Sequence, residues 1–277
     1  MAPWSGTLQN APWWALILAL LGIFILYQIL SNEDYRQAFI FLRSGIRLTV
    51  IVTTSAYVIA ATIGLITGLG RVSDNIIPYT LSTLYVEIIR GVPMLVQLIY
   101  VAFVIVPLAI SGANGLGNWI LGSSALAATL QGPAQWLAVL SIRDVDMTTR
   151  GIIGLAVGYG AYEAEVYRAG IQSIERGQME AARSLGMSYF QAMRYVILPQ
   201  AVKRVLPPLG NDFIAMLKDS SLLSALAIRE LTQLGKLNRA STFRTFETWN
   251  TVTFLYLTMT ILLSMGVKVL ERRMAID

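Results

Sequence analysis

Residues 91–142 read GVPMLVQLIYVAFVIVPLAISGANGLGNWILGSSALAATLQGPAQWLAVLSI and contain no Asp, Glu, Lys or Arg. Residues 48–70 and 248–267 are also free of charge. An apolar run of about 20 residues is long enough to cross the hydrocarbon core of a bilayer as a helix. Over the whole chain, 55% of residues are hydrophobic and 13% are charged, against about a quarter charged in ordinary soluble proteins. The pattern predicts an all-α integral membrane protein.

The residue types that are missing exclude several classes of function. The chain has no Cys, so it holds no disulfide, thiolate metal site or cysteine nucleophile. It also has no His, the commonest general base and metal ligand. We therefore predict no catalytic residue and no metal site. The net charge of +5 does not indicate nucleic acid, because no basic run is interleaved with aromatic residues.

About six segments are expected to cross the bilayer. They cover residues 13–30, 47–70, 86–110, 151–170, 206–228 and 249–270. A secretory signal peptide is the alternative for the first, but no Lys or Arg precedes it, and Trp13 and Trp14 resemble interfacial anchors. A retained helix is favoured.

The orientation follows from the distribution of Lys and Arg. Their densest cluster lies in residues 168–204, and a basic tail follows the last span, which favours cytoplasmic termini. Four basic residues on the opposite side, between positions 229 and 244, argue against this assignment. With cytoplasmic termini, residues 31–45 and 113–149 are external. Gly and Pro residues interrupt residues 113–149, so we predict an insertion of interfacial or short helical pieces there.

The polar stretch at residues 171–208 has clear local signals. Residues 174–185 are predicted to form a helix that ends at Gly186 in a left-handed cap. Ser188 then begins a second helix, and Gln191 completes a capping box. Pro199 is expected to end that second helix. The pattern predicts two short helices outside the membrane, with an ordinary solvated loop as the alternative.

The residues of this stretch resemble the signature loop of bacterial ABC-importer permeases. The match consists of Glu180-Ala181-Ala182, Gly186, Val196 and Leu198-Pro199 at the family's spacing, with Val196 where the family usually has Ile. The resemblance extends from about residue 39 to the C-terminus. Five more blocks resemble the polar amino acid branch of the family, at residues 87–93, 167–170, 209–213, 218–222 and 230–232.

This resemblance implies a type I ABC importer permease fold with a cytoplasmic coupling helix. Residues 1–38 would form an additional N-terminal transmembrane helix, and residues 39–277 the permease core. The core would contain the 113–149 insertion and a cytoplasmic coupling loop at 171–204. The residues that would couple this loop to the ATPase are Glu180, Ala181, Ala182, Gly186, Leu198 and Pro199.

The resemblance also implies the partners and the location. The chain has no G-x-x-x-x-G-K-[ST] loop, so ATP and Mg²⁺ would be bound by a partner ATPase and no cofactor by this chain. The expected partners are an ATPase subunit dimer, a second identical or homologous permease, an extracytoplasmic amino acid binding protein and the lipid bilayer. The complex would import polar amino acids, including basic ones, through the bacterial cytoplasmic (inner) membrane.

Two rival functions remain open at this point. A self-sufficient secondary transporter or channel for small polar solutes would also place charges in its spans. It would not explain two capped helices that match a coupling loop. A membrane enzyme is the other rival, and without His or Cys it would depend on Lys218 with Ser220 or Ser221.

Ionisable residues in the spans are candidates for substrate contact, because charge inside a membrane is costly. Glu163 would bind the cationic group of a substrate or form an ion pair with Arg168 or Lys218, and the two alternatives carry equal weight. Residues 218–221 offer both charge signs and two hydroxyls, so Lys218, Asp219, Ser220 and Ser221 are candidate substrate-binding residues. An internal Lys218–Asp219 pair explains the charges equally well. Glu87 and Arg90 lie one helical turn apart and are predicted to form a structural pair.

Overall fold

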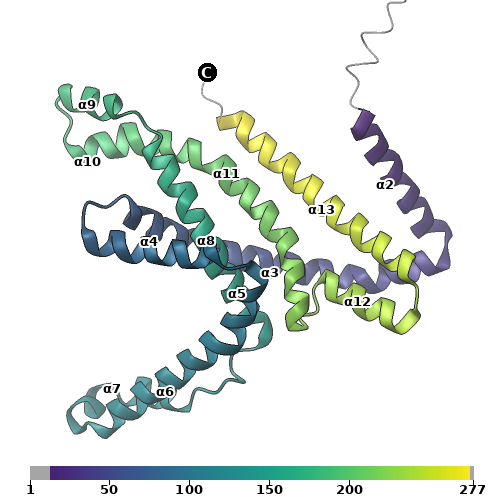
Figure 1. The fold of residues 1–277 in the computed structure, drawn as a ribbon, viewed down its shortest axis with the longest axis horizontal. Helices are drawn as coiled ribbons and strands as arrows, with labels where there is room; N and C mark the ends of the chain where they lie inside the picture. The colour runs from purple at the N-terminus through teal and green to yellow at the C-terminus, as the bar shows by residue number, and fades with distance from the viewer. Residues whose placement is uncertain (1–12, 275–277) are drawn as a thin grey trace, which may run out of the picture.

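A computed structural model describes residues 13–274, and all regular structure in that range is helical. The predicted all-α fold is therefore confirmed for this part of the chain. Figure 1 shows long helices that cross in a bundle, with a short helical pair projecting at the upper left and a helical hairpin projecting at the lower left. The long helices are α2 (Trp13–Ser31), α3 (Glu33–Arg71), α8 (Met147–Gln172), α11 (Leu198–Asp219) and α13 (Thr245–Met274).

Shorter helices connect the long ones. Between α3 and α8 lie α4 (Ile76–Gly91), α5 (Met94–Tyr100), the π-helical turn η1 (Val101–Ile105), α6 (Val106–Gly122) and α7 (Ser124–Val139). The projecting pair is α9 (Arg176–Ser184) and α10 (Tyr189–Ala192), and the π-helical turn η2 (Met193–Ile197) joins it to α11. The 3-10 helix η3 (Ser220–Leu226) and α12 (Leu231–Thr242) precede α13.

The centre of the bundle is the packing of α3 against α8, the most extensive contact between two helices in the described range. Gly64 and Gly68 of α3 lie against Glu163 and Tyr167 of α8. A Cβ atom at Gly64 would come within 2.7 Å of Glu163 Cβ, and one at Gly68 within 2.8 Å of Tyr167 Cβ. Small residues at four-residue spacing let two membrane helices approach this closely. Their placement brings the polar side chains of α8 into the interior.

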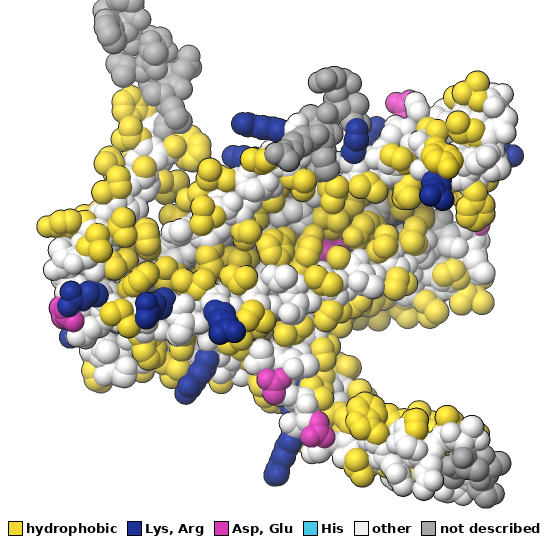
Figure 2. Space-filling view, turned by 180° about the vertical axis from the view of Figure 1, so that it is seen from behind, with side chains coloured by type: hydrophobic (Ala, Val, Ile, Leu, Met, Phe, Trp, Pro, Cys, Tyr) yellow, Lys and Arg dark blue, Asp and Glu magenta, His cyan; other side chains and the backbone are white. Residues whose placement is uncertain are grey.

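Within residues 13–274, four helical runs are long and apolar enough to cross a membrane. They are Trp13–Ser31, Glu33–Arg71, Met94–Gly122 and Thr245–Arg272. The remaining predicted spans correspond to α8 and α11, which carry ionisable residues along their length. Figure 2 shows the resulting surface, with hydrophobic side chains across the middle of the face and most basic and acidic side chains towards its edges.

Two predicted boundaries differ from the structure. The segment 31–45, expected to be an external loop, is mostly helical, because α3 begins at Glu33 and Asn32 caps it by accepting a hydrogen bond from Asp34 N at 2.9 Å. The predicted span 86–110 is divided at Pro93, between α4 and α5. Residues 1–12 of the predicted N-terminal segment and residues 275–277 lie outside the described range.

The two π-helical turns explain why two prolines do not end their helices. η1 ends two residues before Pro107, and η2 ends two residues before Pro199. Proline lacks an N–H and clashes with the carbonyl four residues earlier, and a locally widened turn relieves both problems. The prediction that a helix ends near Pro199 is therefore wrong, because the chain continues directly into α11. After Pro107, α6 likewise continues to Gly122.

Candidate functional site

The loop between α8 and α11 has the local geometry that its sequence predicts. Gly186 has φ +82°, so the left-handed cap is confirmed. The N–H groups of Gly186 and Met187 donate to the carbonyls of Arg183 and Ala182, at 3.0 and 3.2 Å. This is the paired arrangement of a Schellman cap. The capping box of Ser188 and Gln191 is also confirmed. These contacts close the chain on itself and hold α9 and α10 as a compact projection from the bundle (Figure 1).

The predicted coupling residues differ in exposure. Glu180 and Ala181 face outward on α9, whereas Ala182 is only 3% exposed and packs inside the chain. Ala182 is therefore not available to an approaching surface. Leu198 and Pro199 are exposed, but they lie in the first turn of α11 rather than on the projecting pair.

Two apolar residues at the tip of the projection were missed by sequence reasoning. Leu185 is 81% exposed and Phe190 is 84% exposed. They flank the capped turn, on a segment that is polar and lies apart from the apolar spans. A large apolar residue on each side of a predicted cap in a hydrophilic loop is the signal that would have identified them. Glu180 is also exposed on α9, so the projection carries large apolar side chains and a carboxylate at its surface.

Glu163 is the most unusual buried residue of the bundle. It is 0% exposed, and neither carboxylate oxygen has a hydrogen-bond partner among residues 13–274. The predicted ion pairs with Arg168 and Lys218 do not form, because Arg168 binds Glu165 and Gln172, and Lys218 is exposed elsewhere. A buried charge without a partner is costly. The alternative in which Glu163 forms an ion pair with Arg168 or Lys218 is therefore not what the structure shows.

The neighbours of Glu163 do not compensate its charge. Tyr57 and Tyr85 are close enough to interact with it electrostatically, but their hydroxyls donate to the carbonyls of Leu209 and Val157, at 2.9 and 2.6 Å. The charged group that acts on Glu163 is the Asp212 carboxylate, which has the same sign. One Asp212 oxygen is likewise buried without a partner.

Glu230 is the informative comparison, because it is also 0% exposed. Its carboxylate caps α12 by accepting hydrogen bonds from the backbone N–H groups of Thr232 and Gln233, at 2.8 and 2.7 Å. Tyr256 adds a third donor at 2.8 Å. Three donors satisfy a buried carboxylate without a cation. Glu163 is equally buried but has no such donor, so its lack of hydrogen-bond partners is not a general consequence of burial.

The four residues at positions 218–221 do not form one polar cluster. They lie at the end of α11 and the start of η3, rather than in the middle of a helix. Asp219 accepts a hydrogen bond from Tyr159 at 2.8 Å, and Ser220 donates to the Leu217 carbonyl at 2.7 Å. Lys218 and Ser221 line a different groove, of about 480 Å³, which α12 and α13 also border. The predicted Lys218–Asp219 pair is not among the ion pairs of the described residues.

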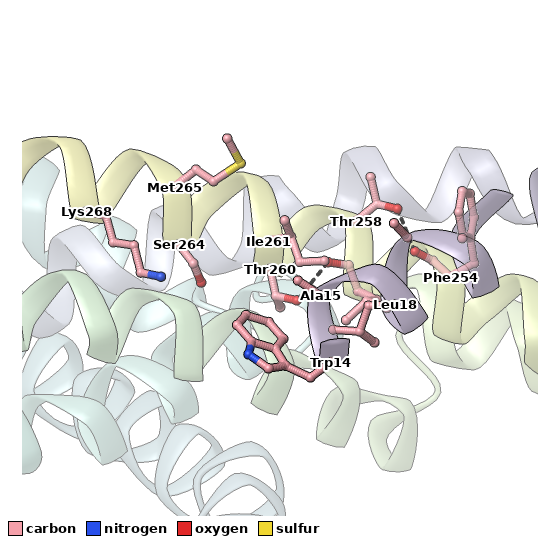
Figure 3. Close-up of a pocket in the computed structure, with 13 residues that line it drawn as sticks. Trp14, Ala15, Leu18, Phe254, Thr258, Thr260, Ile261, Ser264, Met265 and Lys268 are labelled. Carbon is pink, nitrogen blue, oxygen red and sulfur yellow. Dashed lines mark hydrogen bonds between the residues drawn. The ribbon is translucent and has the colours of Figure 1, made fainter. Parts of the chain in front are cut away.

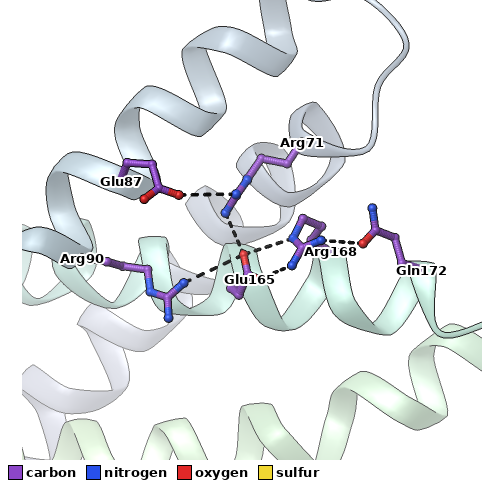
Figure 4. A network of polar contacts seen from close by, with 6 residues as sticks. All are labelled: Arg71, Glu87, Arg90, Glu165, Arg168 and Gln172. Atoms are coloured by element: carbon purple, nitrogen blue, oxygen red, sulfur yellow. Dashed lines mark hydrogen bonds and ion pairs between the residues drawn. The ribbon is translucent and has the colours of Figure 1, made fainter.

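Glu165 is the centre of a polar network that joins α3, α4 and α8 (Figure 4). It accepts a hydrogen bond from Arg71 at 2.7 Å, and Arg168 binds both of its oxygens. Arg90 lies at 4.0 Å from the same carboxylate, and Glu87 at 3.6 Å from Arg71. The predicted Glu87–Arg90 pair therefore has to be corrected. Each residue binds a partner on a neighbouring helix, because α4 presents both to the ends of α3 and α8.

Among the described residues, no group of three or more Asp or Glu side chains is arranged to hold a metal ion. What the fold and these residues define is a helical membrane protein with a compact helical projection at one end and, inside its bundle, a buried carboxylate without a partner among the described residues.

Comparisons with known proteins give the family. Residues 60–276 match the binding-protein-dependent transport system inner membrane component, and the chain belongs to this family. It is therefore the permease subunit of an ABC importer and not an enzyme, since a separate ATPase subunit hydrolyses ATP. An ATPase and a binding protein are partners of this family in general.

Individual relatives agree with this assignment. The glutamine transport system permease protein GlnP of Escherichia coli is 32% identical over 232 residues, covering 84% of this chain and 92% of the relative. The arginine transport system permease protein ArgU of Corynebacterium glutamicum is 32% identical over 222 residues, covering 76% and 63%.

Solved structures show the same fold. An amino acid ABC transporter crystallised with histidines superposes with a TM-score of 0.67 at 35% identity, covering 88% of this chain and 98% of that one. The MetNI methionine transporter, at 19% identity and a TM-score of 0.59, is similar in fold.

Proposed function

We propose that this chain carries polar amino acids, and cationic ones in particular, through the bacterial inner membrane. The proposal that the substrate is cationic rests on Glu163, a fully buried carboxylate with no partner among the described residues. A guanidinium or ammonium group of a substrate would supply the missing positive charge and the missing hydrogen-bond donors together. The glutamine and arginine permeases among the relatives support an amino acid as the substrate.

Glu163 is enclosed between α3 and α8, so the substrate would reach it in a state in which the helices have separated. Alternating access in an importer requires such a rearrangement. The close packing of Gly64 over Glu163 makes the closed state compact, with no room for the substrate. We infer that substrate binding and the closed packing of α3 against α8 exclude one another.

The projection of α9 and α10 is proposed as the ATPase contact. Glu180, Ala181, Leu185 and Phe190 would form its surface, and Gly186 would hold its shape. Leu198 and Pro199 would act indirectly, by joining the projection to α11. ATP and Mg²⁺ would be bound by an ATPase dimer, with no cofactor in this chain. A second permease chain, identical or homologous, and an extracytoplasmic amino acid binding protein would complete the complex.

A self-sufficient secondary transporter, the alternative that the sequence left open, is not supported by the family match. It would need an ion-coupling site and would have no use for the exposed, capped helix pair. The two functions are separated by reconstituting the chain in liposomes with and without its ATPase subunit and the binding protein. Uptake of radiolabelled arginine should require the ATPase and ATP. Uptake by this chain alone, driven by an ion gradient, would contradict the proposal.

A further inference from the structure

A groove runs between α2 and the C-terminal half of α13, away from both the projection and Glu163. Its volume is about 540 Å³, within the range of small-molecule pockets. One wall consists of small or apolar residues of α2, among them Ala15, Ala19 and Gly22. The other wall, from α13, mixes apolar side chains with the hydroxyls of Thr258, Thr260 and Ser264 and with Lys268. Figure 3 shows Lys268 at one end of the groove, Phe254 at the other, and Trp14 between them.

The length of the groove matches one leaflet of a bilayer. Its lining extends from Trp14 to Gly22 on α2 and from Phe254 to Lys268 on α13. At a rise of 1.5 Å per residue these segments are roughly 12 and 21 Å long. Half of a hydrocarbon core is roughly 15 Å thick. A partner's transmembrane helix crosses both leaflets and would contact a groove about 30 Å long. The acyl chain of one lipid crosses a single leaflet, which is the length of this groove.

The end of the groove has the chemistry of a headgroup site. Lys268 is exposed there and belongs to none of the ion pairs found in the described part of the chain. Trp14 is 69% exposed, and an indole N–H with an apolar ring suits the boundary between headgroups and acyl chains. The start of α2 and the end of α13 lie on the same side of the molecule as α9 and α10 (Figure 1). A basic side chain at the mouth of an apolar groove between two membrane helices fits a lipid phosphate.

We propose that this groove binds one anionic phospholipid from the leaflet on the side of α9 and α10. An acyl chain lies between α2 and α13, and the phosphate is bound by the Lys268 ammonium. The lipid fills the space between α2 and the rest of the bundle, where the most apolar window of α2 is only 6% buried by protein. The site does not depend on which solute the importer carries.

Two pairs of variants test this site in the full chain purified with its ATPase. Lys268→Gln removes the headgroup contact, and Lys203→Gln is the control, because Lys203 is an exposed lysine of α11 outside the groove. Gly22→Leu fills the groove with a side chain whose Cβ meets nothing within 4 Å. Gly266→Leu is its control, because Gly266 is also unobstructed but does not line the groove.

Native mass spectrometry with phosphatidylglycerol and with phosphatidylcholine of identical acyl chains measures the binding. The unmodified chain should bind phosphatidylglycerol about fivefold more tightly than phosphatidylcholine, the effect of one lysine near a headgroup. Lys268→Gln should abolish this preference, Gly22→Leu should weaken binding of both lipids, and both controls should bind as the unmodified chain does. Equal binding of the two lipids would overturn the proposal, as would equal losses in variants and controls. If Gly22→Cys crosslinks to a second permease chain, a protein helix occupies the groove, and this result would also overturn the proposal.

Discussion

The Arg71 guanidinium at the end of α3 lies 2.7 Å from the Glu165 carboxylate of α8, a residue 94 positions later in the chain. The contact ties two central helices together, and Arg168 and Arg90 approach the same carboxylate. The side chain of Glu165 is only 27% exposed, so water would replace its contacts with the arginines poorly if its charge were removed. One carboxylate therefore holds three guanidinium groups near the end of α8 from which the α9–α10 projection starts.

We expect Glu165→Gln to lower the stability of the chain and the transport of every substrate. The loss of a charged hydrogen bond costs about 1.5–3 kcal/mol. Arg90 and Arg168 would remain without an anion, and Arg71 would keep only Glu87. Thermal unfolding in detergent measures the effect. Glu33→Gln is the matched control, because its ion pair with Arg36 is more than half exposed and such pairs contribute about 0–1 kcal/mol.

A charge swap distinguishes this network from a simple pair. The double variant Arg71→Glu with Glu165→Arg should not restore stability, because the introduced arginine would face Arg90 and Arg168. Full recovery in the double variant would show that only the Arg71–Glu165 contact matters.

Glu163→Gln should separate substrates by charge. If the carboxylate binds a cationic group, transport of arginine and lysine should fall at least tenfold relative to glutamine, corresponding to about 1.4 kcal/mol or more. The thermal midpoint should not fall, because the variant removes a buried charge that has no partner in the described structure. Uptake by proteoliposomes, with the three amino acids compared in one preparation, provides the measurement.

Glu165→Gln is the natural control for this experiment, since it lies two residues away and should reduce all substrates together. An equal loss for cationic and neutral amino acids in Glu163→Gln, with unchanged assembly, would contradict the recognition role.

Gly186→Val should abolish transport while the chain still inserts and reaches normal levels. At φ +82° a β-branched side chain is strained, so the turn between α9 and α10 should lose its shape. Uptake and ATPase co-purification are measured on the same membranes. Gly177→Val is the control, because Gly177 is also on the projection but has no left-handed backbone and no atom within 4 Å of its Cβ position. Full transport by Gly186→Val with a normal ATPase complex would refute the coupling assignment.

Topology is testable by cysteine labelling, because the chain has no cysteine of its own. A cysteine at Ser123, between α6 and α7, should react only with a reagent added outside the cell. A cysteine at Ser184, exposed on α9, should react only from the cytoplasm. Labelling of position 123 from the cytoplasm alone would overturn the expected orientation, in which both termini are cytoplasmic.

The sequence alone was sufficient for features that depend on near neighbours. The left-handed turn at Gly186 and the capping box of Ser188 rest on contacts within a few residues, so their residue types predict them. The membrane character likewise follows from uncharged runs, because the cost of placing charge in hydrocarbon is set by composition. The block resemblance supplied the permease class, but not the exposure of individual side chains such as Ala182.

Only the tertiary structure decided which charges are paired. Residues 163 and 165 are both glutamates on one helix, yet about 200° of rotation directs them to different neighbours. Glu165 pairs with Arg71, Arg90 and Arg168. Glu163 packs against Gly64 and is acted on by the charge of Asp212. Apart from Arg168, which lies one turn along α8, the partners come from α3, α4 and α11, and helix packing brings them together across long sequence separations. For the same reason the sequence did not predict the Glu87 and Arg90 partners, whereas one-turn spacing suggested a pair within α4.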